Sequence, residues 1–459
     1  MKKIKNMILI KKENLLLTAI ILLSFFLFLS PAIKAEKIEL VKPDYQSFKL
    51  DNGLEFMVFP DHSLPLIRYS IYYNVGSIDE AKTNTGISHF LEHLMFLGTK
   101  NLPEANIDDL ISSVGGQLNA ATSYDYTYYY HEVPSSMLEL VMALESDRMN
   151  NLKFDPKEIN REREVIKQER RMRTENNIFA KGFEEIRAEI FKDTYLEHSV
   201  IGWMDDLNNI SVSDLKNHYQ RYYSPNNALV VVSGDVKMEQ VKKFAKEYYS
   251  DYQPAAIKAK DLELKLDQNK NRHQVYLDTN MPYALQLYQI PAADNLEITA
   301  IEIFLDILAN NQSSRLQQKL KREKGLILAS GGFSYPLRSD SFALVYFIPR
   351  NENLVKKAQT AFDQQMQKIL NQGITEAEFK LVKKQYQKSL IFSQKDINSA
   401  ASTYALNKLR FDQSDLLAAK IDYINNLNKD ELIRIAKKYF SKSKQKTGYI
   451  LPQNKGGAQ

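Results

Sequence analysis

Two of the seven histidines in this chain, His89 and His93, are four residues apart, with Glu92 beside the second. If the segment is helical, both imidazoles and the carboxylate lie on one face within about one turn. Neutral imidazole is a good zinc donor, and a carboxylate in this position can take a proton from water without binding the metal. Because a zinc site needs a third protein ligand, the pattern requires a distant segment to pack against this helix. Without that ligand, the five-residue pattern is also one that arises by chance.

A candidate for the third ligand lies on a helix predicted over residues 156–174. Glu162 and Glu169 are seven residues apart, so they lie two turns apart along one stripe of that helix. Glu169 could bind the metal while Glu162 orients a histidine from behind. The same helix carries further glutamates and several arginines, as charged solvent-exposed helices do. Spacing alone therefore leaves both interpretations open.

The pattern of apolar residues predicts alternating strands and helices in the first half. Strand patterns cover residues 48–60 (around an Asp-Asn-Gly turn), 67–75, 122–133 and 228–233. Helix patterns cover residues 85–97, 105–114, 135–150 and 156–174. Residues 254–271 are charged and aperiodic, and strand character resumes at Val275. We therefore expect a first domain at residues 36–253, a linker at 254–271 and a second domain at 272–459.

The two halves share one local pattern. Residues 212–232 and 429–451 each read as a helix with an aromatic pair, a polar turn and a strand. An internal duplication would produce this similarity. Since any helix-turn-strand unit gives a similar pattern, independent origins remain the alternative.

The net charge of +5 is confined to residues 1–35, which contain six lysines and one glutamate. The remaining chain is formally neutral, which argues against a nucleic-acid binder. Five of the lysines precede an uncharged apolar run at residues 14–33, which is followed by Lys34 and Ala35 after the small residue Ala32. This order predicts a signal peptide at residues 1–35, cleaved after Ala35 or Ala32. A retained membrane anchor is the alternative, because about 20 apolar residues can span a bilayer.

The chain contains no cysteine. This excludes disulfides, a thiol nucleophile and cysteine-ligated zinc. It also fits export, because such a chain cannot form wrong disulfides in an oxidising compartment. We expect an exported, periplasmic protein that is not held at the membrane once the signal is removed.

Four blocks of the sequence resemble the peptidase family of pitrilysin, insulin-degrading enzyme and the mitochondrial processing peptidase, and especially its short bacterial members. The blocks are residues 75–99 (with GISHFLEHLMFLGT), 115–127 (GGQLNAATSYDYT), 161–169 (REREVIKQE) and 201–235. They follow one another through nearly all of the first half. The resemblance implies an α+β fold of two similar α/β-sandwich domains related by duplication. Each has a mixed, largely antiparallel sheet flanked by helices, the LuxS/MPP-like metallohydrolase fold.

Carried over position by position, the resemblance assigns roles to the residues above. It makes His89, His93 and Glu169 the ligands of one zinc ion per chain. Glu92 becomes the general base, and Glu162 a supporting carboxylate. The implied activity is that of a zinc metalloendopeptidase.

The same resemblance implies the substrate and how it is held. Asn119, Ala120 and Ala121 match an edge strand that pairs with the substrate backbone, as an exposed strand edge can do with an extended peptide. An ordinary turn-strand junction is the alternative for these three residues. The substrates expected are exported peptides or unstructured polypeptides. The competing function is a non-catalytic subunit of the same fold that holds peptides or supports assembly.

The second half departs from the family pattern at one pair of positions. Family members place an Arg and a Tyr, seven residues apart, against the substrate carbonyl, and the matching positions here are Lys321 and Leu328. Leu328 has no hydrogen-bond donor, and an oxyanion donor contributes several kcal/mol to catalysis. We therefore expect a homologous partner subunit that carries the Arg/Tyr pair in a heterodimer, or otherwise a homodimer. The alternative is that Tyr335 or another nearby tyrosine substitutes.

Overall fold

The computed structural model describes residues 38–39, 42–102, 107–257, 260, 262–266 and 270–453. The predicted signal peptide, residues 1–35, lies outside the described residues, as do both expected cleavage positions. Among the described residues, no helix combines the length and the apolar character needed to cross a lipid bilayer. The described residues from 42 onward belong to one compact unit.

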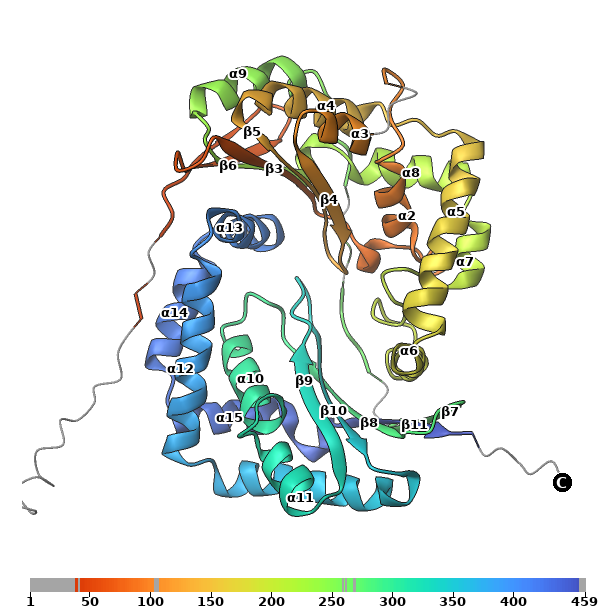
Figure 1. Ribbon diagram of the computed structural model, residues 1–459, viewed down its shortest axis with the longest axis vertical. Coiled ribbons are helices and arrows are strands. Elements are labelled where there is room, and N and C mark those ends of the chain that lie inside the picture. Colours follow the sequence, from red (N-terminus) through yellow and green to blue (C-terminus); the bar gives the residue numbers. More distant parts are fainter. Residues whose placement is uncertain are drawn as a thin grey trace, which may run out of the picture. The chain divides into compact units, whose positions relative to one another are not determined.

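A six-stranded mixed sheet forms the centre of the first half (Figure 1). Its strand order is β1-β2-β6-β3-β5-β4, and only the pair β2-β6 is parallel. The strands are β1 (Gln46–Lys49), β2 (Glu55–Pro60), β3 (Leu66–Tyr73), β4 (Gln117–Thr122), β5 (Thr127–Pro134) and β6 (Ala228–Gly234). Strand β6 is buried along its whole length, because it is internal and covered on both faces. Strand β4 forms one edge.

A five-stranded sheet forms the centre of the second half. Its strand order is β7-β11-β8-β10-β9, and only the pair β7-β11 is parallel. The strands are β7 (Arg272–Leu277), β8 (Tyr283–Ile290), β9 (Ile327–Ser334), β10 (Ser341–Pro349) and β11 (Lys446–Pro452).

The two sheets have the same topology. When β1 is set aside and the strands of each sheet are counted in chain order, both sheets read 1-5-2-4-3. In each sheet the fifth strand follows a helix of the matching repeat, α8 (Val212–Tyr222) before β6 and α15 (Lys429–Phe440) before β11. The predicted α+β fold of two similar, duplicated halves is therefore confirmed. The pattern shared by residues 212–232 and 429–451 belongs to that duplication.

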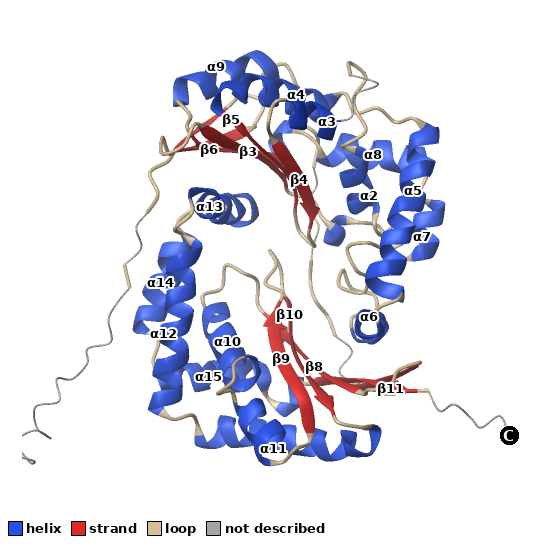
Figure 2. Cartoon of the chain, in the orientation of Figure 1, coloured by secondary structure: helices blue, strands red, loops and turns tan. Residues whose placement is uncertain are grey.

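Helices flank both sheets (Figure 2). In the first half they are α2 (Ile87–Leu94), α3 (Ile107–Ser113), α4 (Leu138–Asn150), α5 (Pro156–Arg170), α6 (Ile178–Ile190), α7 (Met204–Asn209), α8 and α9 (Met238–Tyr249). In the second half they are α10 (Glu297–Leu305), α11 (Val355–Gln372), α12 (Glu376–Ser393), α13 (Ile397–Phe411), α14 (Leu416–Asn426) and α15. π-helical segments are η3 (Arg171–Glu175), η5 (Asp306–Asn310) and η6 (Gln317–Glu323). Single 3₁₀ turns are η1 (Ser77–Asp79), η2 (Ser135–Met137), η4 (Pro225–Asn227), η7 (Glu352–Leu354) and η8 (Lys442–Lys444).

One helix of each half packs on the sheet of the other half (Figure 1). Helix α13 lies against β3 and β6, where Tyr72 donates to Ser402 Oγ (3.0 Å) and Ser233 donates to Asn398 Oδ1 (2.7 Å). Helix α6 lies against β7 and β11, and a Cβ on its Gly182 would overlap the β11 side chain of Ile450. Each sheet therefore depends on the other half to cover one face.

The structure departs from the prediction at the start of β5 and at the start of α2. The strand predicted over residues 122–133 begins at the last residue of β4 and includes the turn at residues 123–126, so only its part from Thr127 onward is β5, which pairs antiparallel with β4. The Ser123 amide donates to Tyr126 O (2.8 Å), and this hydrogen bond closes the turn. The run of Tyr and Thr in the sequence does not indicate a turn at this point. The helix predicted over 85–97 begins only at Ile87, because Gly86 is left-handed (φ 87°).

A buried ionic cluster lies between the first sheet and the end of α2. His131 Nε2 of β5 is 2.6 Å from Glu145 Oε1 of α4, and Arg148 pairs with the same carboxylate oxygen. Burial by itself would raise the pKa of Glu145, but Arg148 and His131 hold it below its ordinary value. Arg148 Nε donates to Met95 O (2.8 Å), the residue that ends α2. The cluster thereby ties the last turn of α2 to the sheet and to α4.

Candidate metal centre

The start of helix α2 is held by a buried carboxylate and by two glycines. Glu80 accepts the amide hydrogens of Gly86 (2.7 Å) and Ser88 (2.9 Å), which a helix start leaves without intrahelical partners. Burial raises the pKa of Glu80 to about 8. Gly86 and Gly202 both have positive φ, and a Cβ on either would overlap a backbone oxygen of the other segment. The close approach of these two glycines therefore fixes the first turn of α2 against the backbone at Gly202.

Helix α5 is fixed against α2 by its own arginine. The helix begins at Pro156, and the Asp155 carboxylate caps it by accepting the amide hydrogen of Lys157 (2.8 Å). About two turns further on, the Arg163 guanidinium lies over the ring of Phe90 from α2, 5.2 Å from its centroid. It also donates to Ile210 O (2.7 Å), just beyond α7. These contacts turn the stripe that carries the predicted glutamates toward α2.

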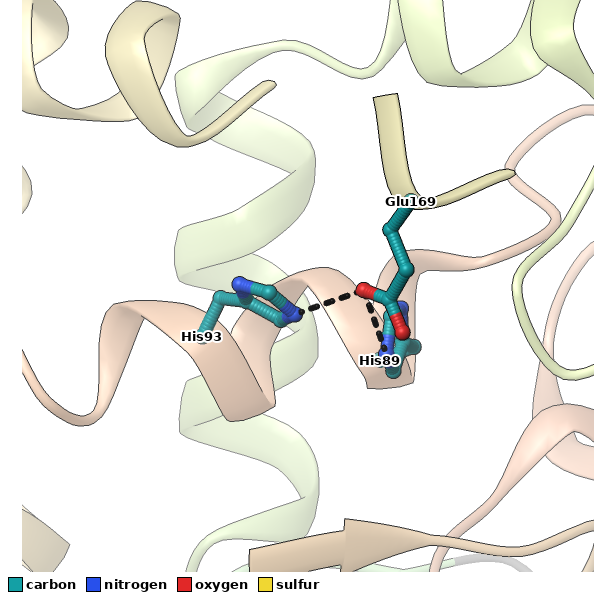
Figure 3. A group of neighbouring side chains, drawn as sticks. All are labelled: His89, His93 and Glu169. Carbon is teal, nitrogen blue, oxygen red and sulfur yellow. Dashed lines mark ion pairs between the residues drawn. The ribbon is translucent and has the colours of Figure 1, made fainter. Parts of the chain in front are cut away.

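The structure brings His89, His93 and Glu169 together (Figure 3). Glu169 Oε2 lies 3.3 Å from His93 Nε2 and 3.7 Å from His89 Nε2, and the three ligand atoms all lie within 4.8 Å of one another. Tetrahedral zinc with bonds of about 2.0–2.1 Å needs ligand atoms roughly 3.4 Å apart. Two imidazoles and one carboxylate, spaced in this way, fit a zinc ion that keeps one position for water.

Two further charged groups hold the ligand side chains in place. Glu162 Oε2 lies 3.4 Å from His93 Nδ1, on the side of the ring away from Glu169. Arg173, from the π-helical segment η3, pairs with Glu169 Oε1 at 2.7 Å and leaves Oε2 facing the histidines. Such outer contacts set the orientation and the tautomer of metal-binding histidines.

The two histidines have opposite electrostatic surroundings. Burial and, to a lesser extent, the neighbouring His93 lower the pKa of His89 to about 4, so its ring is neutral. Burial would also lower the pKa of His93, but Glu162 and Glu169 outweigh it and raise the value to about 9. For Glu169, burial is outweighed by His93 and His89, which lower its pKa. His93 and Glu169 thus stabilise each other's charge before any cation is bound.

Glu92 lies on the same helix but is outside the three-residue cluster. Thr122, at the end of β4, donates its hydroxyl hydrogen to Glu92 Oε2 at 2.5 Å. Burial raises the pKa of Glu92 above its ordinary value. Thr122 was assigned no role from the sequence, because its contact with Glu92 exists only once the end of β4 lies against α2. No local pattern in the sequence marks this threonine.

Two family models match the chain. The model described as Insulinase (Peptidase family M16) matches residues 61–202, and the model described as Peptidase M16 inactive domain matches residues 209–386. The chain belongs to peptidase family M16. The resemblance stated from the four sequence blocks is thereby confirmed. The second match begins ahead of β6, an internal strand of the first sheet, so it does not coincide with the division between the sheets.

Relatives of this M16 chain cover most of its length. The zinc protease PqqE of Helicobacter pylori is 28% identical over 421 residues, which are 89% of this chain and 93% of that protein. The crystal structure of a protease from Helicobacter pylori has a TM-score of 0.83 at 26% identity, covering 90% of this chain and 100% of that one. The periplasmic protease PqqL of Escherichia coli has a TM-score of 0.72 at 22% identity, covering 90% of this chain but 48% of that one. The M16 chain thus spans about half of PqqL.

The predicted substrate strand of this M16 chain is the edge strand β4. Asn119 and Ala121 of β4 pair with Tyr130 and Tyr128 of β5, and on its other side β4 has no strand neighbour among the described residues. Asn119 Oδ1 accepts the amide hydrogen of Ala120 at 2.8 Å. An incoming peptide that bonds to this amide has to displace that side chain.

The two positions at which this chain departs from the family pattern lie in its second half. Lys321 lies in the π-helical segment η6, and Leu328 lies on the edge strand β9, where it is 37% exposed. Tyr335, the alternative donor, stacks edge-on against Tyr124 with ring centroids 5.8 Å apart. Whether a partner supplies the missing donor stays a prediction.

Gly202→Ala tests whether the position of α2 controls the metal centre. We expect it to lower the melting temperature and to weaken zinc binding by roughly 10-fold or more, because the new Cβ overlaps Thr85 O and displaces the first turn of α2. Gly115→Ala is the matched control, since Gly115 has nearly the same φ (+78° against +76°) but nothing within 4 Å. Both variants share the left-handed strain of about 1–2 kcal/mol. Equal zinc affinities, measured with a competing chelator, would contradict the expectation.

Proposed function

We propose that this M16 chain is a zinc-dependent endopeptidase that hydrolyses peptide bonds in exported peptides or unstructured polypeptides. The observation that carries the proposal is the convergence of His89, His93 and Glu169 from two helices within 4.8 Å. One zinc ion per chain would be held by these three side chains. The naming of family relatives as zinc proteases supports this reading.

The chain's own residues supply the proton transfers. A zinc ion bound here would act as a Lewis acid toward the scissile carbonyl and would lower the pKa of a bound water to about 7. Glu92 takes the proton from the attacking water and passes it to the leaving amine. Thr122 holds one oxygen of Glu92, so the other carboxylate oxygen is the one that exchanges the proton. Glu162 keeps His93 oriented toward the metal throughout.

The substrate is held as an added strand. Asn119, Ala120 and Ala121 lie on the open edge of the first sheet, beside the strand end that carries Thr122. An extended peptide that pairs with this edge is recognised through its backbone, which suits unstructured chains of varied sequence. Folded proteins lack a free extended segment and would be poor substrates.

A homologous partner subunit would complete the site. Leu328 cannot donate a hydrogen bond to the substrate carbonyl, and a subunit with an Arg/Tyr pair would supply that donor. The length of PqqL, about twice that of this chain, supports a pairing of two M16 halves. A homodimer is the second arrangement to be distinguished.

The proposed location is the periplasm. The lysine-rich start and apolar run of residues 1–35 support export, and the Escherichia coli relative is named a periplasmic protease. Removal of the signal would release the chain from the membrane.

Glu92→Gln is expected to lower kcat on an internally quenched peptide by about 10²–10⁴-fold, because an amide cannot accept the proton from water. Zinc content should be unchanged, since Glu92 is outside the ligand cluster. The assay uses the chain together with any subunit that copurifies with it. Equal activities of the variant and the wild type would favour the non-catalytic peptide-holding function.

Glu169→Gln is expected to weaken zinc binding strongly, because it removes the one charged ligand of the site. Glu164→Gln, on the same helix, is the matched control, since Glu164 is exposed and pairs only with a neighbouring lysine in the described structure. Zinc affinity of both variants is read from chelator competition. If the two substitutions had the same small effect, the metal centre would lie elsewhere.

Lys321→Arg combined with Leu328→Tyr is expected to raise the kcat of the chain assayed alone by about 10²-fold or more, because it restores an oxyanion donor. Lys321→Arg with Leu328→Phe is the control, since phenylalanine has the ring but no hydroxyl. If the Phe variant gains as much activity as the Tyr variant, or neither gains any, the missing-donor argument for a partner is wrong.

A further inference from the structure

Three cations from outside the first sheet converge on two loops beside the metal centre. They are Lys260 from the segment between the two sheets, Arg338 from the loop between β9 and β10, and Arg410 from α13. The two loops are residues 74–80, which precede α2, and the β4–β5 turn at residues 123–126. We call these three cations and the two loops that they bind the cross-half lock.

The centre of the cross-half lock is Asp125, whose side chain is fully buried. Asp125 Oδ2 accepts hydrogen bonds from Arg410 Nε (2.8 Å) and from the backbone amide of Arg338 (2.7 Å). Arg410 also donates to Pro336 O at 2.7 Å, so one guanidinium joins the turn to the β9–β10 loop. The turn is thus bonded to two segments of the second half.

The other loop is held by the same cations. The Arg338 guanidinium donates to Asn74 Oδ1 (2.7 Å), to Asp125 O (3.1 Å) and to Asp79 Oδ1 (2.5 Å). Lys260 Nζ donates to the carbonyl oxygens of Ile78 (2.8 Å) and Glu80 (3.0 Å). Glu80 is the residue whose carboxylate caps α2.

The two loops are also bonded to each other and lead directly to Glu92. The amide of Ile78 donates to Tyr124 O at 2.9 Å, and a Cβ on Gly76 would overlap this turn. Thr122 immediately precedes the turn and holds Glu92 at 2.5 Å. A displacement of the turn therefore moves the hydroxyl that orients the carboxylate.

We propose that Arg338 and Arg410 are positioning residues for Glu92, acting through Asp125, the β4–β5 turn and Thr122. The second half in this way sets the geometry of the proton-transfer group in the first half. Apolar packing of the same volume would join the halves at least as stably as buried ion pairs do. The charged groups add hydrogen bonds of defined direction, and the acceptors of these bonds lie in the two loops that flank the site. The proposal rests on the endopeptidase function proposed above.

Arg410→Met tests the proposal in the zinc-loaded full chain with any copurifying subunit. We expect kcat to fall about 10–100-fold, as for outer contacts of metal centres, while KM and zinc affinity stay within about twofold of wild type. Hydrogen exchange of the amides at residues 122–127 should become faster. Arg410→Lys, which keeps the charge and one bond to Asp125, should recover much of the lost kcat. Thr122→Val should lower kcat in the same way.

Arg315→Met is the matched control. Arg315 pairs with Glu378 inside the second half, so its loss removes a comparable ion pair without touching the cross-half lock. It should leave kcat and exchange at residues 122–127 unchanged. If Arg410→Met does not fold, Asp125→Asn replaces it, because it weakens the same bonds without changing the volume.

Three results would overturn the proposal. The first is a kcat within about threefold of wild type although exchange in the turn is faster. The second is a raised KM with an unchanged kcat, which would make the lock a substrate contact. The third is that Thr122→Val leaves kcat unchanged while Arg410→Met lowers it. A wild-type chain that binds zinc but cleaves no peptide would instead refute the endopeptidase function, whatever the exchange data show.

Discussion

The contact on which the site depends is the one between His93 of α2 and Glu169 of α5, at 3.3 Å across two helices. A metal-ligand set tolerates errors of only a few tenths of an ångström, so both helices must be held firmly. Helix α2 is held at its start by Glu80 and the Gly86–Gly202 approach, and at its end by Arg148. At the interface itself, Glu162 and Glu169 raise the pKa of His93, and His93 lowers the pKa of Glu169.

The duplicated architecture explains why a half without the histidine motif is retained. Apart from β1, both sheets have the strand order 1-5-2-4-3, and each uses a helix of the other half to cover one face. Apolar faces of this size cannot remain open to water, so neither sheet is complete without the opposite helix. The same arrangement brings Arg410 of α13 to the buried Asp125. The helix that covers one face of the first sheet is therefore also the helix that brings Arg410 to the site.

Sequence reasoning reached part of the site and stopped where contacts became long-range. The four-residue spacing correctly placed His89 and His93 on one face of a helix. Spacing alone left Glu169 undecided between ligand and surface charge, and only the family resemblance selected it. The sequence predicts one strand over residues 122–133, although residues 123–126 form the turn before β5, because that turn contains no glycine or proline to mark it. Thr122, Arg338 and Arg410 were not found, since each acts on a segment far away in the chain.

The sequence by itself determined what depends on neighbouring residues: the helical face with its two imidazoles and a carboxylate, the repeated helix-turn-strand units and the absence of thiol chemistry. These follow from periodicity and side-chain chemistry, which are local. Only the tertiary structure decided which oxygen of Glu169 faces the histidines, which hydroxyl holds Glu92 and which cations reach Asp125. Those choices arise when distant segments pack against each other at bonding distance, and no local pattern encodes the packing.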